Sequence, residues 1–199
     1  SGKNFKIFTM PKKFPKDVLK IKKKLVIGFD PKLYNEKELK FFFNFKNIIL
    51  KPLSKNLIDI IWTKRPRSLI KPFYSLSKKD SGENSRKKIS KIKNILIKNK
   101  VNCLFVTAPE NVAWLLNIRG HDSSFSPIPN ARLLINNLGN IDLFSSPEKI
   151  IKIKKYFFNK INFYNESEIE KKLKTIKQNK IWLDNLSCSI RFKYLLLKK

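Results

Sequence analysis

The most informative stretch of the chain is TAPENVAWLLNIRGHDSSFSPIP, which runs from Thr107 to Pro129. Pro109 occupies the first-turn position that proline favours in helices, so an apolar helix is predicted to begin there. An Arg-Gly-His-Asp turn and two prolines follow this helix. Polar residues directly after an apolar helix are typical of the rim of a site. We therefore look for a site in the loop that begins at Arg119.

The residues around this stretch predict an α/β module. Asn84 or Ser85 can cap a helix that runs to residue 99, and Ile89, Ile92 and Leu96 form its apolar stripe. Strands are predicted at 102–107, 131–135, 141–144, 161–164 and 180–183, and helices at 147–157, 166–177 and 187–197. The turn at 136–140, rich in Asn and Gly, should join its two flanking strands as an antiparallel hairpin.

The N-terminal part predicts a smaller module of the same class. Strands are expected at 4–9, 24–29 and 47–50. Asn35 and Glu38 form a capping-box pattern ahead of a helix at 39–45. We therefore expect an α/β protein in which helices flank a mixed sheet. Residues 1–61 form one partial module, 62–83 a proline-containing linker, and 84–199 one complete module.

Four segments carry a family resemblance. The run from Asn111 to Gly120, with Asp122 and Pro127, resembles a signature in the second N-terminal domain of Xaa-Pro aminopeptidases (aminopeptidase P), which are creatinase-like metallopeptidases. Residues 1–5, 27–31 and 61–66 resemble the Asp-Gly-Arg-Tyr-Phe, Ile-Gly-Tyr-Asp-Pro and Trp-Thr-x-Arg-Pro segments of that family, in the same order. The resemblance is thus collinear over nearly the whole chain.

The resemblance implies fold, chemistry and partners. It implies a ribonuclease H-like fold for the two creatinase-N-like modules. It also implies a C-terminal pita-bread domain that holds two divalent metals, usually manganese. We expect that domain to lie beyond Lys199, and we expect the first module to start before Ser1. In a complete protein the substrates would be peptides with proline second. The N-terminal domains would shape the substrate entrance and make subunit contacts, so a homo-oligomer is possible.

Composition argues against a catalytic centre within these residues. His121 is the only histidine, and the five glycines are far apart. A dinuclear hydrolase needs clustered oxygen ligands and imidazoles. We therefore predict no catalytic residue, no metal site and no cofactor in this chain, and we expect it to be inactive alone.

The candidate site residues lie in the segments that carry the resemblance. Arg119 is expected to pair with a carboxylate, which is either Asp122 on the same turn or an acidic group brought by the C-terminal domain or the substrate. Gly120 is expected to allow a sharp turn, with a positive φ. Asn117 and Trp114 also belong to the candidate loop residues, and Trp114 is expected to lie in the core. Trp62 and Arg65 are expected to anchor the two modules to each other.

The formal net charge of +29 permits two interpretations. Clustered Lys and Arg would indicate nucleic-acid binding. Here the lysines are spread along the whole chain and flank apolar residues at helical spacing, which favours solvated helix faces with nonspecific adhesion to polyanions.

Other features of the sequence favour a reduced compartment. Cys103 and Cys188 belong to no metal or disulfide pattern, and no segment has the pattern of a signal peptide or a membrane span. We expect a cytoplasmic protein without a membrane association. A stand-alone binding or regulatory module with the same fold is the alternative function.

Overall fold

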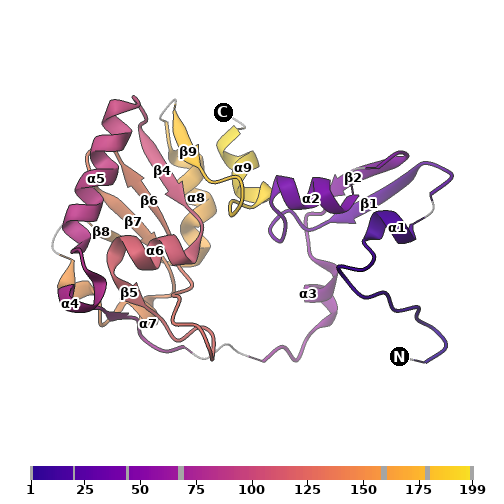
Figure 1. Ribbon diagram of the computed structural model, residues 1–199, viewed down its shortest axis with the longest axis horizontal. Helices are drawn as coiled ribbons and strands as arrows, with labels where there is room; N and C mark the ends of the chain where they lie inside the picture. The colour runs from indigo at the N-terminus through magenta and orange to yellow at the C-terminus, as the bar shows by residue number, and fades with distance from the viewer. Residues whose placement is uncertain are drawn as a thin grey trace. The chain divides into compact units, whose positions relative to one another are not determined.

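The computed structural model describes residues 2–19, 21–43, 45–66, 70–157, 161–177 and 180–197. The described residues divide into two compact units. The first unit comprises the residues up to Arg65 together with Ser189–Arg191, and the second comprises the residues from Pro66 onward apart from those three. Each unit has its own elements and its own apolar core (Figure 1).

The first unit is built around a β-α-β motif. In it β1 (Leu25–Phe29) pairs in parallel with β2 (Ile48–Pro52), and α2 (Glu36–Phe43) connects the two strands. The Asn35 Oδ1 accepts a hydrogen bond from the Glu38 N–H at 2.8 Å, and the Asn35 N–H donates to Glu38 Oε2 at 3.3 Å. This confirms the predicted capping box. The short helices α1 (Pro15–Val18) and α3 (Leu57–Ile61) precede and follow the motif.

The strand predicted at residues 4–9 is wrong. Among the described residues no strand pairs with this segment, and Phe5 and Ile7 are each 73% exposed. Alternating apolar residues form a stable strand only where a neighbouring strand or another packed surface covers them.

The second unit contains a five-stranded mixed sheet. Its strands are β4 (Cys103–Val106), β6 (Arg132–Asn136), β7 (Ile141–Phe144), β8 (Ile161–Tyr164) and β9 (Ile181–Leu183), in the spatial order β8-β7-β6-β4-β9. The pairs β4–β6 and β6–β7 are antiparallel, whereas β7–β8 and β4–β9 are parallel. The predicted hairpin is therefore confirmed, and Gly139 supplies the positive φ of 86° that its turn requires.

Helices cover both faces of this sheet. In β4, Leu104 and Val106 pack on the cluster that includes residues of α5 (Ser85–Lys98) and α6 (Pro109–Leu116). Cys103 and Phe105 face the opposite cluster, which includes residues of α8 (Ile169–Thr175) and α9 (Ile190–Leu197). Figure 1 shows the strands of the sheet between α5 and α8. The α/β class with a mixed sheet is confirmed.

Three predicted helices are shorter than the sequence suggested. The segment 147–157 forms α7 (Pro147–Ile150) and the 3-10 turn η1 (Lys154–Tyr156) rather than one helix. Its three β-branched isoleucines at 150, 151 and 153 weaken the preference for a continuous helix. The last helix begins at Ile190, not at Ser187, and η2 (Glu166–Glu168) precedes α8.

The second unit also includes residues from the segment predicted as a linker. There β3 (Tyr74–Ser75) pairs antiparallel with β5 (Ile118–Arg119), and α4 (Lys78–Ser81) follows. Phe73, just before β3, is completely buried. This segment therefore packs beneath the loop that begins at Arg119.

Candidate functional site

The candidate site begins where α6 ends. Pro109 lies in the first turn of α6, as predicted, and Val112, Ala113, Leu115 and Leu116 are buried. The helix stops at its C-cap residue, which adopts a left-handed conformation with φ 53° and ψ 40°. That residue is Asn117, and asparagine tolerates this conformation better than most side chains.

The side chain of Asn117 is buried and fully hydrogen-bonded. Its Nδ2 donates to Ser81 Oγ at 3.0 Å and to the Glu83 carbonyl at 2.8 Å. Its Oδ1 accepts from Lys88 Nζ at 2.7 Å. The backbone carbonyl of Asn117 also accepts from the Leu76 N–H at 2.8 Å. Asn117 therefore joins the end of α6 to the segment of α4 and β3.

Lys88 is a residue of this site that the sequence did not predict. Its ammonium group donates to the Trp114 carbonyl at 2.9 Å as well as to Asn117, and the residue is 3% exposed. Burial lowers the pKa of Lys88, while the charge of Glu83 opposes the shift and that of Arg119 adds to it. The sequence did contain a signal for the burial of Lys88, because Lys88 lies four residues before Ile92 and eight before Leu96, which belong to the apolar stripe of α5. At that spacing it belongs to the inward face of α5.

The prediction that Trp114 lies in the core is wrong. Trp114 is 52% exposed, although its neighbours in α6 are buried. An eight-residue helix on a sheet buries one face, and residue 114 falls on the other face. The indole ring covers the Lys88 ammonium, which lies 4.6 Å from the ring centroid.

Arg119 is held by backbone groups. It lies in β5 opposite Tyr74, and its Nη1 donates to the Ile118 carbonyl at 2.9 Å and to the Ala113 carbonyl at 3.3 Å. The alternative in which Arg119 pairs with Asp122 on the same turn is therefore wrong. The guanidinium instead satisfies carbonyls at the end of α6, which a cation near a helix C-terminus does favourably.

Gly120 is required by close packing and not by its φ angle. Its φ lies outside the left-handed region, so the expected positive φ is wrong. A Cβ at this position would lie 2.7 Å from the backbone Cα of Pro129 and 2.9 Å from Asp122 Oδ2. The Gly120 N–H donates to the Pro127 carbonyl at 2.8 Å. The two ends of the loop thus touch at Gly120.

Asp122 closes the loop through an ion pair with Lys149. The pair is largely buried, with the side chains of Lys149 and Asp122 11% and 17% exposed. The other oxygen, Asp122 Oδ2, accepts from the Asn130 N–H at 2.8 Å. The Lys149 carbonyl accepts from the Phe73 N–H at 2.7 Å. Asp122 therefore connects both ends of the loop to α7 and to the segment before β3.

The tip of this loop carries exposed rings. Phe125 is fully exposed, and the ring of His121 lies 5.2 Å from that of Tyr74.

The remaining two residues of the predicted site, Trp62 and Arg65, lie in the first unit. Trp62 is the C-cap residue of α3 and is 49% exposed. The Arg65 guanidinium lies 5.3 Å from the Trp62 ring centroid. Arg65 also pairs with Asp59 at 2.9 Å.

The described residues offer little catalytic chemistry of their own. Among them, no group of three or more His, Cys, Asp or Glu side chains is placed to hold a metal ion. Burial raises the pKa of the Cys188 thiol to about 11, so this thiol is not a nucleophile near neutral pH. No described helix has the length and apolar composition to span a bilayer.

The second unit is a mixed α/β domain whose loop from Arg119 to Asn130 is held by Asp122, Gly120 and Arg119. Comparison with known proteins identifies its family. Residues 64–199 match the Creatinase/Prolidase N-terminal domain family. The Xaa-Pro aminopeptidase app-1 of Caenorhabditis elegans is 34% identical over 140 residues, which are 69% of this chain and 23% of that protein. A probable Xaa-Pro aminopeptidase P of Coprinopsis cinerea is 34% identical over 108 residues, which are 52% of this chain and 17% of that protein.

A solved structure agrees with these relatives. The X-prolyl aminopeptidase from Caenorhabditis elegans, a cytosolic enzyme with a di-nuclear active site, matches 78% of this chain and 26% of its own with a TM-score of 0.67 and 27% identity. The chain belongs to the creatinase/prolidase N-terminal domain family, so the resemblance seen in the sequence is confirmed. It spans about a quarter or less of the length of these curated relatives.

Proposed function

We propose that this chain is the non-catalytic N-terminal part of a metal-dependent Xaa-Pro aminopeptidase, and that the loop from Arg119 to Asn130 shapes the entrance to its active site. The substrates would be peptides with proline second. The reaction would take place on two divalent metals, manganese by preference, in a separate pita-bread domain. The residues of this chain would sort peptides by shape before they reach that domain.

The fixed geometry of the loop is the observation that supports this role. Asp122 pairs with Lys149, Gly120 packs against Pro129, and Arg119 is held by carbonyls of α6 and β5. A loop that is already in place does not have to be ordered when a peptide arrives, so it can exclude a wrong shape at little entropic cost.

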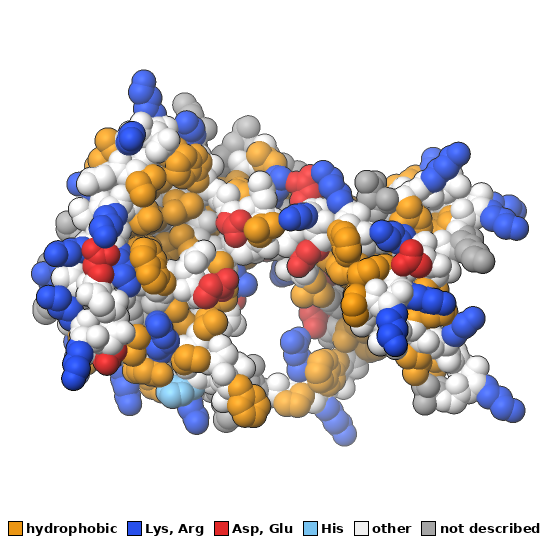
Figure 2. All heavy atoms as spheres, viewed as in Figure 1, with side chains coloured by type: hydrophobic (Ala, Val, Ile, Leu, Met, Phe, Trp, Pro, Cys, Tyr) orange, Lys and Arg blue, Asp and Glu red, His pale blue; other side chains and the backbone are white. Residues whose placement is uncertain are grey.

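Several finer features belong to the same proposal. Both modules would have the ribonuclease H-like fold. The first would be a partial module at 1–61, and the second would comprise residues 84–199 together with β3 and α4 from the segment predicted as a linker at 62–83. Trp62 and Arg65 would anchor the modules, and parts of this region would make the subunit contacts of a homo-oligomer. The protein would be cytoplasmic. Its net charge of +29 would produce only nonspecific adhesion to polyanions. Figure 2 shows Lys and Arg side chains scattered over the visible face, which agrees with nonspecific adhesion.

A chimera tests the entrance role. This chain would replace the matching N-terminal residues of the Caenorhabditis elegans relative, and kcat/KM would be measured for a short and a long peptide with proline second. In the Asp122→Ala chimera we expect the ratio of the two values to change, whereas exchanging the exposed Lys152 for Ala should leave it unchanged. Equal ratios in the unaltered chimera and in both variants would contradict the proposal.

A further inference from the structure

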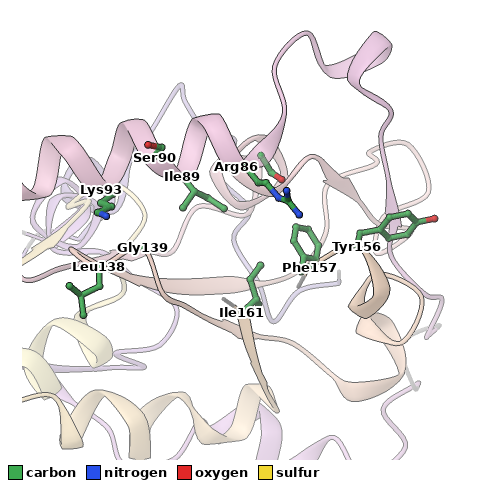
Figure 3. A pocket seen from close by; sticks show the side chains of 10 residues that line it. Arg86, Ile89, Ser90, Lys93, Leu138, Gly139, Tyr156, Phe157 and Ile161 are labelled. Carbon is green, nitrogen blue, oxygen red and sulfur yellow. The ribbon is translucent and has the colours of Figure 1, made fainter. Parts of the chain in front are cut away.

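A second candidate site lies along α5, and none of the residues that line it belongs to the loop from Arg119 to Asn130. It is a pocket of about 390 Å³ between the N-terminal half of α5, the β6–β7 turn, the end of η1 and the start of β8. In Figure 3, Ile89 projects from α5 toward Phe157 and Ile161, and Arg86 lies beside Phe157. All four of these residues line the pocket, which lies entirely within the second unit.

The pocket combines an apolar floor with cations. The floor consists of Ile89 of α5, Phe157 directly after η1 and Ile161 of β8, and Leu138, which is 66% exposed, also lines the pocket. Two cations of α5 border it, and the described residues that line the pocket include no acidic side chain. Such a lining attracts a negatively charged ligand that also has an apolar part.

The spacing of the two cations indicates the form of this ligand. Arg86 and Lys93 are seven residues apart in α5, so about 10 Å separates them along the helix axis. In an extended peptide, residues i and i+4 point to the same side about 13 Å apart, and residue i+2 points to that side between them. The spacing of the two cations along α5 is about 3 Å shorter than the spacing of residues i and i+4 in the peptide, and the long side chains of Arg, Lys and Glu can span this difference.

We propose that this pocket binds an extended acidic peptide segment of a partner protein. One large apolar side chain of the peptide enters the pocket between Ile89 and Ile161. Carboxylates two residues before and two residues after it pair with Arg86 and Lys93. The hydroxyls of Ser85 and Ser90, which also line the pocket, are available to the peptide backbone. This binding site is independent of the proposed aminopeptidase role.

The floor favours a peptide over a nucleic acid. Single strands bind through bases stacked on aromatic faces above a cationic groove. Here Phe157 is the one aromatic ring in the floor, and the other three apolar residues, Ile89, Leu138 and Ile161, are branched aliphatic side chains. Tyr156 is 53% exposed, and in Figure 3 its hydroxyl points away from the pocket. This surface accepts an aliphatic side chain more readily than a stacked base.

A titration of the ¹⁵N-labelled chain with a short peptide tests the proposal. The probe is acetyl-Gly-Glu-Ser-Leu-Ser-Glu-Gly-amide, and the amide signal of Gly139, which borders the pocket, reports binding. We expect Gly139 to shift while Gly28, in the first unit, does not. Replacing the leucine of the peptide by serine, or both glutamates by glutamine, should weaken binding about tenfold or more.

Two double variants separate the pocket from general charge. Arg86→Gln/Lys93→Gln and Lys87→Gln/Lys98→Gln each remove two positive charges from α5, but only the first pair lines the pocket. The pocket variant should bind the probe about tenfold more weakly and the control variant within about twofold of the unaltered chain. Thermal unfolding checks that both variants fold, and the shift of Gly139 in the unaltered chain locates the site without any variant.

Three results would overturn the proposal. Equal losses in both double variants would mean that only net charge matters. Undiminished binding of the serine peptide would mean that the apolar floor plays no part. A thymidine octamer that shifts Gly139 at lower concentration than the peptide would assign the pocket to single-stranded nucleic acid.

Discussion

Replacing Asp122 by alanine should destabilise the second unit by about 3 kcal/mol. The change leaves the ammonium group of Lys149, whose side chain is only 11% exposed, without its partner, and it removes the acceptor of the Asn130 N–H. Breaking a buried pair costs about 3–5 kcal/mol, and the remaining exposure of both side chains reduces this to about 2 kcal/mol. The lost hydrogen bond adds about 1 kcal/mol.

A double-mutant cycle isolates the pair itself. Asp122→Ala, Lys149→Ala and the double variant would be compared by urea unfolding, followed by circular dichroism and by tryptophan fluorescence. We expect a coupling energy of about 1–2 kcal/mol, because each single variant already loses the same interaction. Exchange of the Gly120 amide hydrogen with solvent should accelerate in all three variants. The exposed Lys152→Ala serves as the control and should change stability by less than about 0.5 kcal/mol.

Additive effects of the two single changes would refute this reasoning. They would mean that Asp122 and Lys149 act separately, and unchanged exchange at Gly120 would mean that the pair does not hold the loop closed.

Further predictions concern three other buried positions. Burial lowers the pKa of Lys88 in the folded chain below its ordinary value of 10.5, so between the folded and unfolded pKa values the unfolded chain binds more protons. The free energy of unfolding of the unaltered chain, measured relative to that of Lys88→Met, should therefore increase as pH rises toward 10.5. A difference that stays constant with pH would contradict this. Gly120→Ala should cost about 2 kcal/mol in thermal unfolding, because the new methyl group meets backbone, whereas the exposed Ser124→Ala should be neutral. Cys188 is buried, and its thiol pKa is about 11. Near pH 8, Ellman's reagent should therefore label Cys188 about a hundredfold more slowly in the native chain than after unfolding, and equal rates would contradict its burial.

Local signals in the sequence predicted much of the fold. The cap at Asn35, the cap at Asn84 and the Gly139 hairpin all depend on residues a few positions apart, and all three are confirmed. The order of the strands in space depends on contacts between distant segments. The pairing of β3 with β5 is an example, because Tyr74 and Arg119 are far apart in sequence and neither short strand has a pattern of its own.

The contacts of the candidate site were harder to predict than its location. The resemblance pointed to residues from Asn117 to Asp122 as part of a candidate site, but it did not show the partners of these residues. Asp122 pairs with Lys149 of α7, and Asn117 pairs with Lys88 of α5, so both partners come from other elements. In a chain with 44 Lys and Arg residues, nothing in the sequence separates these two buried lysines from the solvated ones except the position of Lys88 on the inward face of α5.

The most direct test of the account is an assay of the purified chain with manganese and a peptide that has proline second. The proposed function predicts no release of the N-terminal residue, because it assigns the reaction to a separate domain and the described residues hold no metal-binding cluster. Cleavage at a rate comparable with that of the Caenorhabditis elegans enzyme would contradict it.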